Sequence, residues 1–275
     1  MNPTDQPELS GTVLDLDSPH SARMYDYYLG GRTNFRADRA AADQVIKRYP
    51  HVRTTAVENR AFMRRAVRFL AEQGFDQFLD IGTGIPTSPN LHEVVHRVNP
   101  DARVLYVDND PMVLTHARAL MDDTSARRTR YLPADLREPH TVLGSAELAD
   151  TLDLNRPVAL SLLAILHFVR DEDAPLDLVR AYLGALAPGS ALVISHVTAF
   201  YAPAWHELEA IYNTAGVDAQ VRDPEEIALF LDGLELVDPG LVLVDQWRPD
   251  PGSKQLRPEQ VSCYGAVGYL NQHTT

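Results

Sequence analysis

Residues 77–84, which read QFLDIGTG, decide the fold of this chain. A short apolar run that closes on a glycine-rich turn is typical of a buried parallel strand followed by a helix, and the glycines leave bare backbone where a ligand can approach closely. A second apolar run, Val104 to Val107, ends on Asp108. This acid is placed where the hydroxyl groups of a ribose would find acceptors. The pattern therefore predicts a nucleotide-type pocket that spans two neighbouring strand ends.

Two details indicate which ligand such a pocket takes. A dinucleotide-binding turn has the pattern G-x-G-x-x-G, but Thr87 stands at the third glycine position and Pro86 precedes it, so a pyrophosphate would be held poorly. Asp80, just before the first glycine, would repel a pyrophosphate and attract an ammonium group. S-adenosylmethionine carries an ammonium and a sulfonium and has no phosphate, so it is the ligand that suits these residues.

The glycine-rich turn resembles motif I of the class I S-adenosylmethionine-dependent methyltransferases. Asp80, Gly82 and Gly84 stand at the matching positions, whereas Pro86 replaces a usual third glycine. The resemblance implies a Rossmann-like α/β fold, with a mostly parallel sheet of seven strands whose last strand is antiparallel. It also implies S-adenosyl-L-methionine as the cofactor, and the proline implies a loop that is longer and bent differently.

The resemblance extends along most of the chain. Asp108 matches the ribose-binding acid of that family, and Asp135 with Leu136 matches the place where a side chain and a backbone N–H read the adenine edge; Asp135 could equally be a helix N-cap. Residues 21–39 and 232–242 resemble more narrowly the bacterial family called S-adenosyl methyltransferase. That narrower resemblance implies the cofactor and leaves the methyl acceptor open.

The N-terminal segment is the most distinctive part of the narrower family, so we expect it to close over the ligand. The resemblance implies cofactor contacts from the strand-end residues and from this segment. The expected set is Asp80, Gly82, Thr83, Gly84, Asp108, Asn109, Asp135, Leu136, Ser161, Tyr28, Gly30 and Asn34.

The remaining sequence predicts a helical N-terminal cap, residues 1–74, and a methyltransferase domain, residues 75–275. The cap should contain three helices, the last of which opens with the capping box Thr55-x-x-Glu58. After it, strand and helix patterns alternate, which predicts a parallel sheet with right-handed crossovers. Helices are expected at 22–29, 36–48, 55–73, 89–98, 111–121, 139–150, 174–187, 203–214 and 224–231. Strands are expected near 77–81, 103–107, 129–132, 158–163 and 190–195, followed by an antiparallel hairpin of 241–247 and 263–269.

Composition excludes several classes of protein. The chain has 275 residues, of which 45% are hydrophobic and 23% charged, as in an ordinary globular protein, and its formal net charge of −13 argues against a nucleic-acid partner. The single cysteine, Cys263, allows no internal disulfide and no cysteine metal cluster, so no metal is expected. Residues 1–8 do not resemble a signal peptide, and the longest apolar stretch, 158–169, is shorter than the ~20 residues of a membrane span. We therefore expect a cytoplasmic protein with no membrane partner.

Methyl transfer depends mainly on in-line positioning, and a general base matters only when the acceptor must lose a proton. His167 and His196 follow the fourth and fifth expected strands, where open α/β sheets place their ligands, so each is either a catalytic base or a packing residue. The fourth strand lacks the Asn/Asp-Pro-Pro-aromatic signature of enzymes that methylate nucleic-acid bases. We therefore expect O- or N-methylation of a small molecule, such as one from secondary metabolism.

Two other functions are open at this point. A non-catalytic S-adenosylmethionine-binding or regulatory protein would keep the strand-end acids and lack an acceptor pocket. A nicotinamide-dependent oxidoreductase would need a phosphate cradle, which Pro86 and Thr87 do not offer.

Overall fold

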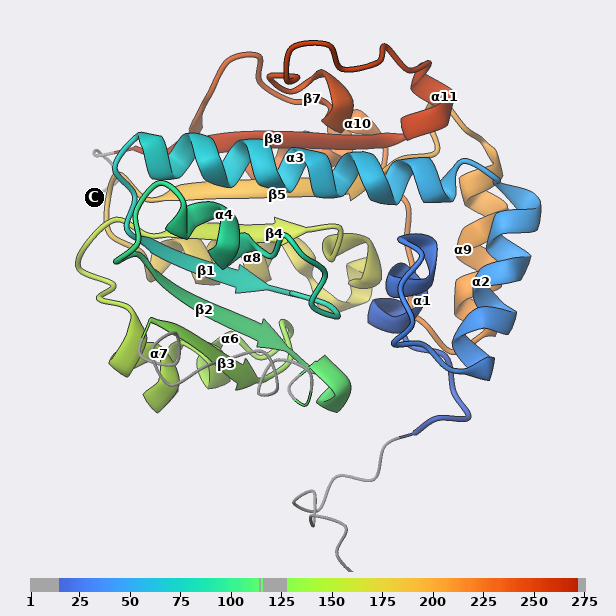
Figure 1. The fold of residues 1–275 in the computed structure, drawn as a ribbon, viewed down its shortest axis with the longest axis horizontal. Helices are drawn as coiled ribbons and strands as arrows, with labels where there is room; N and C mark the ends of the chain where they lie inside the picture. The colour runs from blue at the N-terminus through green and yellow to red at the C-terminus, as the bar shows by residue number, and fades with distance from the viewer. Residues whose placement is uncertain (1–14, 114, 116–127, 272–275) are drawn as a thin grey trace, which may run out of the picture.

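A mixed eight-stranded sheet forms the centre of the molecule. A computed structural model describes residues 15–113, 115 and 128–271 (Figure 1). The strand order is β3-β2-β1-β4-β5-β8-β6, with β7 paired to β8; β1 to β5 are parallel and β8 runs antiparallel to β5. This arrangement confirms the predicted Rossmann-like class I methyltransferase fold. The strands are β1 (Gln77–Ile81), β2 (Arg103–Asp108), β3 (Thr129–Pro133), β4 (Ala159–Leu163), β5 (Ala191–Val197), β6 (Leu234–Leu236), β7 (Val242–Leu243) and β8 (Cys263–Leu270).

Helices cover both faces of this sheet. In Figure 1, α3 lies along one face and α8 lies behind the other, while α1, α2 and α9 lie beyond the ends of the parallel strands. The helices are α1 (Ser21–Tyr28), α2 (Arg36–Arg48), α3 (Val52–Glu72), α4 (Leu91–His96), α6 (Pro139–Leu143), α7 (Ala146–Thr151), α8 (Pro175–Gly184), α9 (Ala204–Thr214), α10 (Pro224–Ala228) and α11 (Pro258–Val261). Single 3-10 turns occur at Leu166–Phe168, Asp171–Asp173, Leu229–Leu231 and Val244–Gln246.

Two apolar cores lie on opposite faces of the sheet, because successive strand side chains point to opposite sides. Phe78 of β1 belongs to the core that α3 covers, and the next residue, Leu79, belongs to the other core. The strand order reverses between β1 and β4. A crevice therefore opens at their carboxyl ends, which is where ligands bind in open sheets of this type.

Several predicted element bounds were wrong. The helix expected at 55–73 begins at Val52, so Thr55 lies inside it and donates a hydrogen bond to the carbonyl oxygen of Val261, at 2.8 Å, and is not a cap. The helix expected at 139–150 is broken into α6 and α7 at Gly144 and Ser145, where the Ser145 hydroxyl caps α7. The helix expected at 89–98 begins at Leu91 and ends at His96. Most of the helix expected at 111–121 lies outside the described residues.

The C-terminal strands also differ from the prediction. β7 pairs with β8 as an antiparallel hairpin, as expected, but it is short because a 3-10 turn begins at Val244. We did not predict β6, which is the main outer partner of β8. Cys263 is buried in β8, as predicted.

Candidate functional site

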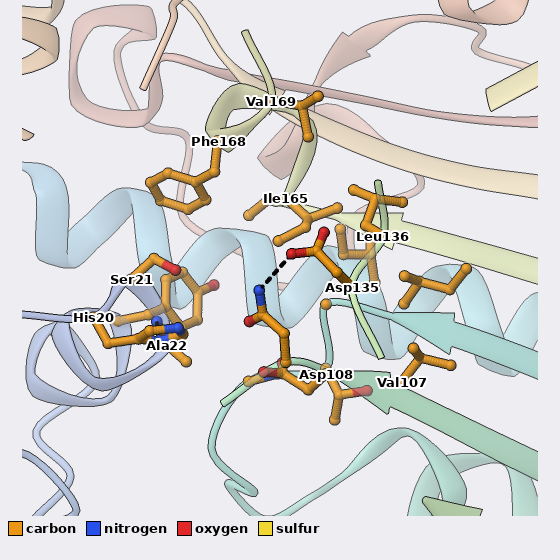
Figure 2. Close-up of a pocket in the computed structure, with 18 of the residues that line it drawn as sticks. His20, Ser21, Ala22, Val107, Asp108, Asp135, Leu136, Ile165, Phe168 and Val169 are labelled. Atoms are coloured by element: carbon orange, nitrogen blue, oxygen red, sulfur yellow. Dashed lines mark hydrogen bonds between the residues drawn. The ribbon is translucent and has the colours of Figure 1, made fainter. Parts of the chain in front are cut away.

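A cavity of about 240 Å³ lies at the carboxyl ends of β1, β2, β3 and β4, and we call it the strand-end cavity (Figure 2). Its floor consists of the turns that follow these strands. Its side wall comes from the N-terminal segment, and Figure 2 shows His20, Ser21 and Ala22 facing Asp108 across the opening. Eight of the predicted contact residues line it: Asp80, Gly82, Thr83, Gly84, Asp108, Asn109, Asp135 and Leu136.

Gly82 brings the main chain close under this cavity. Its φ is +76°, and a Cβ placed on it would lie 2.5 Å from Cγ1 of Ile165. Its N–H donates to the carbonyl oxygen of Val107 at 2.8 Å, which ties the turn after β1 to the end of β2. Only glycine satisfies both the backbone conformation and the close approach.

Asp80 is a buried carboxyl that receives few stabilising contacts from the protein. Its side chain accepts a weak hydrogen bond from Thr83 Oγ1 at 3.3 Å. Burial raises the pKa of Asp80 to about 7, the positive charge of Arg60 and the Thr83 bond oppose the shift, and the charge of Asp108 adds to it. Among the described residues Asp80 forms no ion pair, so a ligand that supplies an ammonium group would stabilise its charged form.

Asp108 is held in a fixed orientation by the main chain. Its Oδ2 accepts the N–H of Gly84 at 2.7 Å, and its Oδ1 accepts the N–H of Asp110 at 2.9 Å. Burial raises the pKa of Asp108, and these two bonds oppose the shift. Each carboxylate oxygen has a second lone pair, so the group can still accept hydrogen bonds from two ribose hydroxyls.

Asp135 caps a turn and not a helix, because its Oδ1 accepts the N–H of Arg137 at 2.8 Å and the next helix, α6, begins only at Pro139. Arg137 donates to it from Nε (3.0 Å) and from a terminal nitrogen (2.8 Å), and Asn109 Nδ2 donates at 3.0 Å, the dashed line in Figure 2. Burial acts to raise the pKa of Asp135, but these hydrogen bonds outweigh it and lower the pKa to about 2. The carboxylate therefore stays ionised and joins the turns after β2 and β3.

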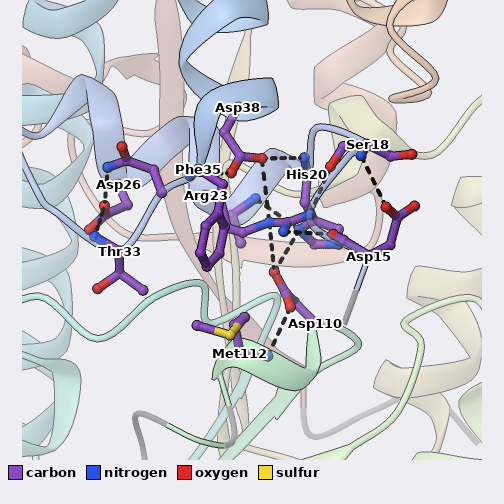
Figure 3. Close-up of polar contacts among 12 residues, drawn as sticks. Asp15, Ser18, His20, Arg23, Asp26, Thr33, Phe35, Asp38, Asp110 and Met112 are labelled. Atoms are coloured by element: carbon purple, nitrogen blue, oxygen red, sulfur yellow. Dashed lines mark hydrogen bonds and ion pairs between the residues drawn. The ribbon is translucent and has the colours of Figure 1, made fainter. Parts of the chain in front are cut away.

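An ionic cluster fixes the N-terminal segment against the cavity wall (Figure 3). Arg23 is 4% exposed; its Nε lies 3.4 Å from Asp38 and 3.5 Å from Asp110, and its terminal nitrogens donate to the carbonyl oxygens of Asp15 and Ser18. His20 Nδ1 lies 3.2 Å from Oδ2 of Asp110. α1 and α2 are thus tied to the loop that follows β2, next to Asp108.

Four residues that we expected at the cofactor lie elsewhere in the structure. Tyr28 and Tyr212 share a hydrogen bond between their hydroxyls, at 2.7 Å, and Asn34 Nδ2 donates to Asp26 at 2.7 Å. Gly30 forms the turn after α1 at φ +80°, and Ser161 is fully buried in β4. None of the four is among the described residues that line the strand-end cavity.

The two predicted histidines are buried, and neither lines the strand-end cavity. His196 is fully enclosed: Arg222 donates to its Nε2 at 3.1 Å, and its Nδ1 lies 2.7 Å from the carbonyl oxygen of Val197. Because an arginine only donates, Nε2 must be the acceptor and Nδ1 must carry the proton. His167 lies on the 3-10 turn after β4 and lines a different space.

That space is a second chamber of about 40 Å³ next to the strand-end cavity. Its lining is mainly aromatic and apolar. It comprises Ser21, Tyr25, Tyr28, Val52, Thr55, Ala56, Asn59, Ala164, His167, Phe168, Val197, Trp205, Glu209, Tyr212, Ala219, Gln220, Val221 and Cys263. Five of these residues also line the strand-end cavity, namely Ser21, Tyr25, Asn59, Ala164 and Phe168. The two spaces therefore share a wall.

Sequence reasoning missed the parts of the site that come from distant elements. His20, Asn59, Arg60 and Phe168 line the strand-end cavity, but none of them belongs to a motif near a strand end. None of the four lies within residues 21–39, the segment that the resemblance singled out, although His20 directly precedes it.

The part of the chain that the structure describes contains no group of three or more His, Cys, Asp or Glu side chains that could hold a metal ion. No helix within residues 15–113 or 128–271 is long and apolar enough to cross a bilayer.

Comparisons with known proteins agree with this geometry. A family model described as S-adenosyl methyltransferase matches residues 7–271. A crystal structure of a DUF574 family protein from Streptomyces avermitilis MA-4680 is 46% identical and covers 93% of this chain and 98% of its own, with a TM-score of 0.90. A candidate methyltransferase from Thermobifida fusca YX is 42% identical, covers 94% of this chain and 97% of its own, and has a TM-score of 0.88. None of the curated proteins compared with the chain matches it.

Proposed function

Because the chain belongs to the S-adenosyl methyltransferase family, and is thus an S-adenosylmethionine-dependent methyltransferase, we propose that it methylates a small molecule at an oxygen or a nitrogen. The observation that carries this proposal is the second chamber beside the strand-end cavity. Its 40 Å³ are lined by buried side chains from several elements. A space of this kind suits a small acceptor better than a segment of a polymer.

The residues of the strand-end cavity fit the cofactor. We assign the ammonium group to Asp80, whose pKa is raised by burial, and the ribose hydroxyls to Asp108. Gly82 contributes bare backbone to the cavity lining. The N–H of Leu136 would read the adenine edge, joined by Asp135 once the ligand displaces one of the four bonds that its oxygens accept from Asn109 and Arg137. When bound, S-adenosyl-L-methionine supplies an electrophilic methyl group on its sulfonium.

The chain's own contribution to the reaction is mainly orientation. The Gly84 and Asp110 N–H groups hold Asp108, and Asn109 and Arg137 hold Asp135, so the ligand contacts exist before the ligand arrives. Tyr25 and Phe168 line both spaces, so they would contact the acceptor as well as the cofactor. Positioning of this kind can supply about 7–11 kcal/mol of the barrier reduction.

The N-terminal part of the chain would act as the cap of this site. The sequence suggested residues 1–74 as the cap and residues 75–275 as the catalytic domain. Since α3 lies along one face of the sheet, whereas α1 and α2 lie beyond the strand ends (Figure 1), we assign the capping role to α1 and α2.

The setting of the reaction is also part of the proposal. The formal net charge of −13 disfavours a nucleic-acid acceptor, and the unpaired Cys263 suits a reducing compartment such as the cytoplasm. A role in secondary metabolism would match a small-molecule acceptor.

Binding and transfer measurements test the proposal in sequence. Calorimetry should show that S-adenosylhomocysteine binds and that NAD does not. Labelled S-adenosylmethionine is then incubated with the protein and with separate small-molecule, nucleic-acid and protein fractions of an extract. Label in the small-molecule fraction is the expected result, and label in either polymer fraction would contradict it. Cofactor binding with no transfer to any fraction would favour the regulatory alternative.

A further inference from the structure

The second chamber is placed where a methyl acceptor must enter. It shares five lining residues with the strand-end cavity, among them Tyr25 and Phe168. Ala164, at φ +52°, is also shared and follows β4, which ends beside β1. The two spaces therefore adjoin, and a compound in the second chamber lies next to a ligand in the strand-end cavity.

Two lining residues of this chamber, Trp205 and His167, have a buried ring nitrogen with no hydrogen bond to another described residue. An indole N–H only donates, so the one of the two that can accept a proton is His167. It is 8% exposed, its Nδ1 is buried without a hydrogen bond, and neither ring nitrogen bonds to another described residue. Its backbone is fixed, because its carbonyl oxygen accepts the N–H of Gln220 at 2.8 Å. A buried polar atom without a partner is costly unless something else in the site satisfies it.

The neighbouring histidine shows what a satisfied imidazole looks like here. The ring centroids of His167 and His196 are 5.4 Å apart. Arg222 donates a hydrogen bond to Nε2 of His196, and Nδ1–H of His196 donates to the carbonyl oxygen of Val197. His196 thus has no capacity left for a ligand, whereas His167 retains both a donor and an acceptor. Only His167 fits the catalytic role that the sequence left open between the two.

The charges around the chamber restrict the acceptor. No lysine or arginine is among the described lining residues, and the one carboxylate, Glu209, accepts the N–H of Val221 at 2.9 Å. An anionic acceptor would have no cation to pair with in this lining. A cationic acceptor would meet the positive sulfonium of the bound cofactor. An uncharged acceptor avoids both costs.

We propose that the second chamber receives the O–H or N–H end of an uncharged acceptor and that His167 accepts the proton which this group loses. The inference rests on the proposed methyltransferase function and specifies its acceptor site. The acceptor's heteroatom gains the bond to the methyl carbon, the sulfur keeps the electron pair of the broken bond, and the proton passes to the unprotonated ring nitrogen of His167. Charge is conserved, because one positive charge leaves the sulfur and one appears on the imidazole.

The size of the chamber sets which part of the acceptor it holds. At 10–15 Å³ per water, 40 Å³ takes about three water molecules. The chamber therefore accommodates the reactive end of an acceptor, and the rest of a larger molecule would lie toward the shared wall of Tyr25 and Phe168. Burial and the nearby His196 and Arg222 hold the pKa of His167 well below 6.5. The ring is therefore neutral and free to accept a proton, and the same surroundings make it a weak base.

Phenol and benzoate test this assignment directly. Each is titrated into the protein saturated with S-adenosylhomocysteine, and binding is followed by calorimetry and by the ring-nitrogen NMR signals of His167. Phenol should shift these signals and bind at least about tenfold more tightly than benzoate, since an unpaired anion is disfavoured here. Equal or tighter binding of benzoate would overturn the proposal.

Two variants locate the binding. Ala219 lines only the second chamber, so Ala219→Leu should fill it and weaken phenol binding by about tenfold while S-adenosylhomocysteine binds as before. The matched control is Ala210→Leu, on the exposed side of α9, which should change neither ligand. His167→Phe keeps a ring beside Phe168 and removes the nitrogens, and should weaken phenol by about two- to tenfold.

The outcomes separate this inference from the proposed function. Failure of S-adenosylhomocysteine to bind the unaltered protein would overturn both. Normal cofactor binding with phenol affinity unaffected by Ala219→Leu would overturn the acceptor site alone. Methylation of phenol to anisole by the unaltered protein, lost in His167→Phe while cofactor affinity stays unchanged, would support the assigned proton transfer.

Discussion

The strand-end cavity and the second chamber share a wall but are built from different parts of the chain. Most of the first is formed by the short turns after β1, β2, β3 and β4, and one of its acids, Asp108, is fixed by backbone N–H bonds. The second is formed by side chains from α1, α3, α9 and β8, which are far apart in the sequence. The cofactor that we assign to the first space would thus be bound by local backbone geometry. The methyl acceptor that we assign to the second would be bound by side chains that only tertiary packing brings together.

This difference predicts that backbone changes damage the first space most. Gly82→Ala should have the largest effect, because the residue adopts φ +76° and a Cβ would lie 2.5 Å from the Ile165 side chain. The expected loss is about 2–5 kcal/mol of folding stability, from the left-handed conformation and the clash together. Chemical denaturation measures this loss.

A matched control separates the clash from the conformational strain. Gly252 has a φ of +83° and nothing within 4 Å of a built Cβ. Gly252→Ala should therefore cost only the strain, about 1–2 kcal/mol. Equal losses in the two variants would show that Ile165 does not press on the glycine turn.

Removal of Asp108, the acid that we assign to the ribose, should have the next largest effect. Asp108→Ala should weaken S-adenosylhomocysteine binding by about 1.5–3 kcal/mol, the range for hydrogen bonds to a charged group. Asp101→Ala is the control, since Asp101 is an exposed acid outside the cavity. Unchanged affinity in the Asp108 variant, measured by calorimetry, would remove this residue from the site.

Cofactor affinity should depend on pH through Asp80. Its pKa of about 7 in the ligand-free protein means that the carboxyl becomes protonated as the pH falls below 7, and a neutral carboxyl cannot pair with an ammonium. Affinity for S-adenosylhomocysteine should therefore fall by up to about tenfold per pH unit between pH 7 and pH 5.5. Asp80→Asn should bind more weakly and lose this dependence, and a variant that kept the same slope would assign the titration to another group.

The smallest effect is expected in the second chamber. Tyr212→Phe removes the hydroxyl that meets Tyr28 at 2.7 Å, and should cost about 0.5–1.5 kcal/mol of folding stability. Cofactor affinity should not change, because Tyr212 does not line the strand-end cavity. Tyr27→Phe, which removes an exposed bond to Asp43, should cost less. Altered cofactor affinity in Tyr212→Phe would show that the two spaces are coupled.

The same contrast explains what could be predicted from the sequence. Asp80 and Asp108 lie at the ends of the apolar strands β1 and β2, and Gly82 directly follows β1. Hydrophobic pattern and turn chemistry were therefore enough to place them at one sheet edge. Tyr28 and Asn34 belong to a segment whose importance was recognised correctly, yet their contacts depend on Tyr212 and on the fold of the turn after α1. No local pattern encodes such partners.

The two histidines show that a local sequence pattern cannot distinguish residues of the same type in similar positions. Each follows a parallel strand, and the sequence gave no basis for choosing between them. The choice depends on Arg222, a residue 26 positions beyond His196 that occupies its lone pair. The break between α6 and α7 is a smaller case, since Gly144 and Ser145 are visible in the sequence but could also have continued a single helix.

The Arg23 cluster has a consequence for how the protein is made. Arg23 and Asp38 leave the ribosome early, but their partner Asp110 lies 72 positions after Asp38 and sits in a loop that exists only once β2 has formed. At 5–20 residues per second, synthesis of that interval takes about 4–14 s. The first helix to emerge therefore stays undocked through much of translation, and the wall that encloses the cofactor is completed only after the sheet has assembled.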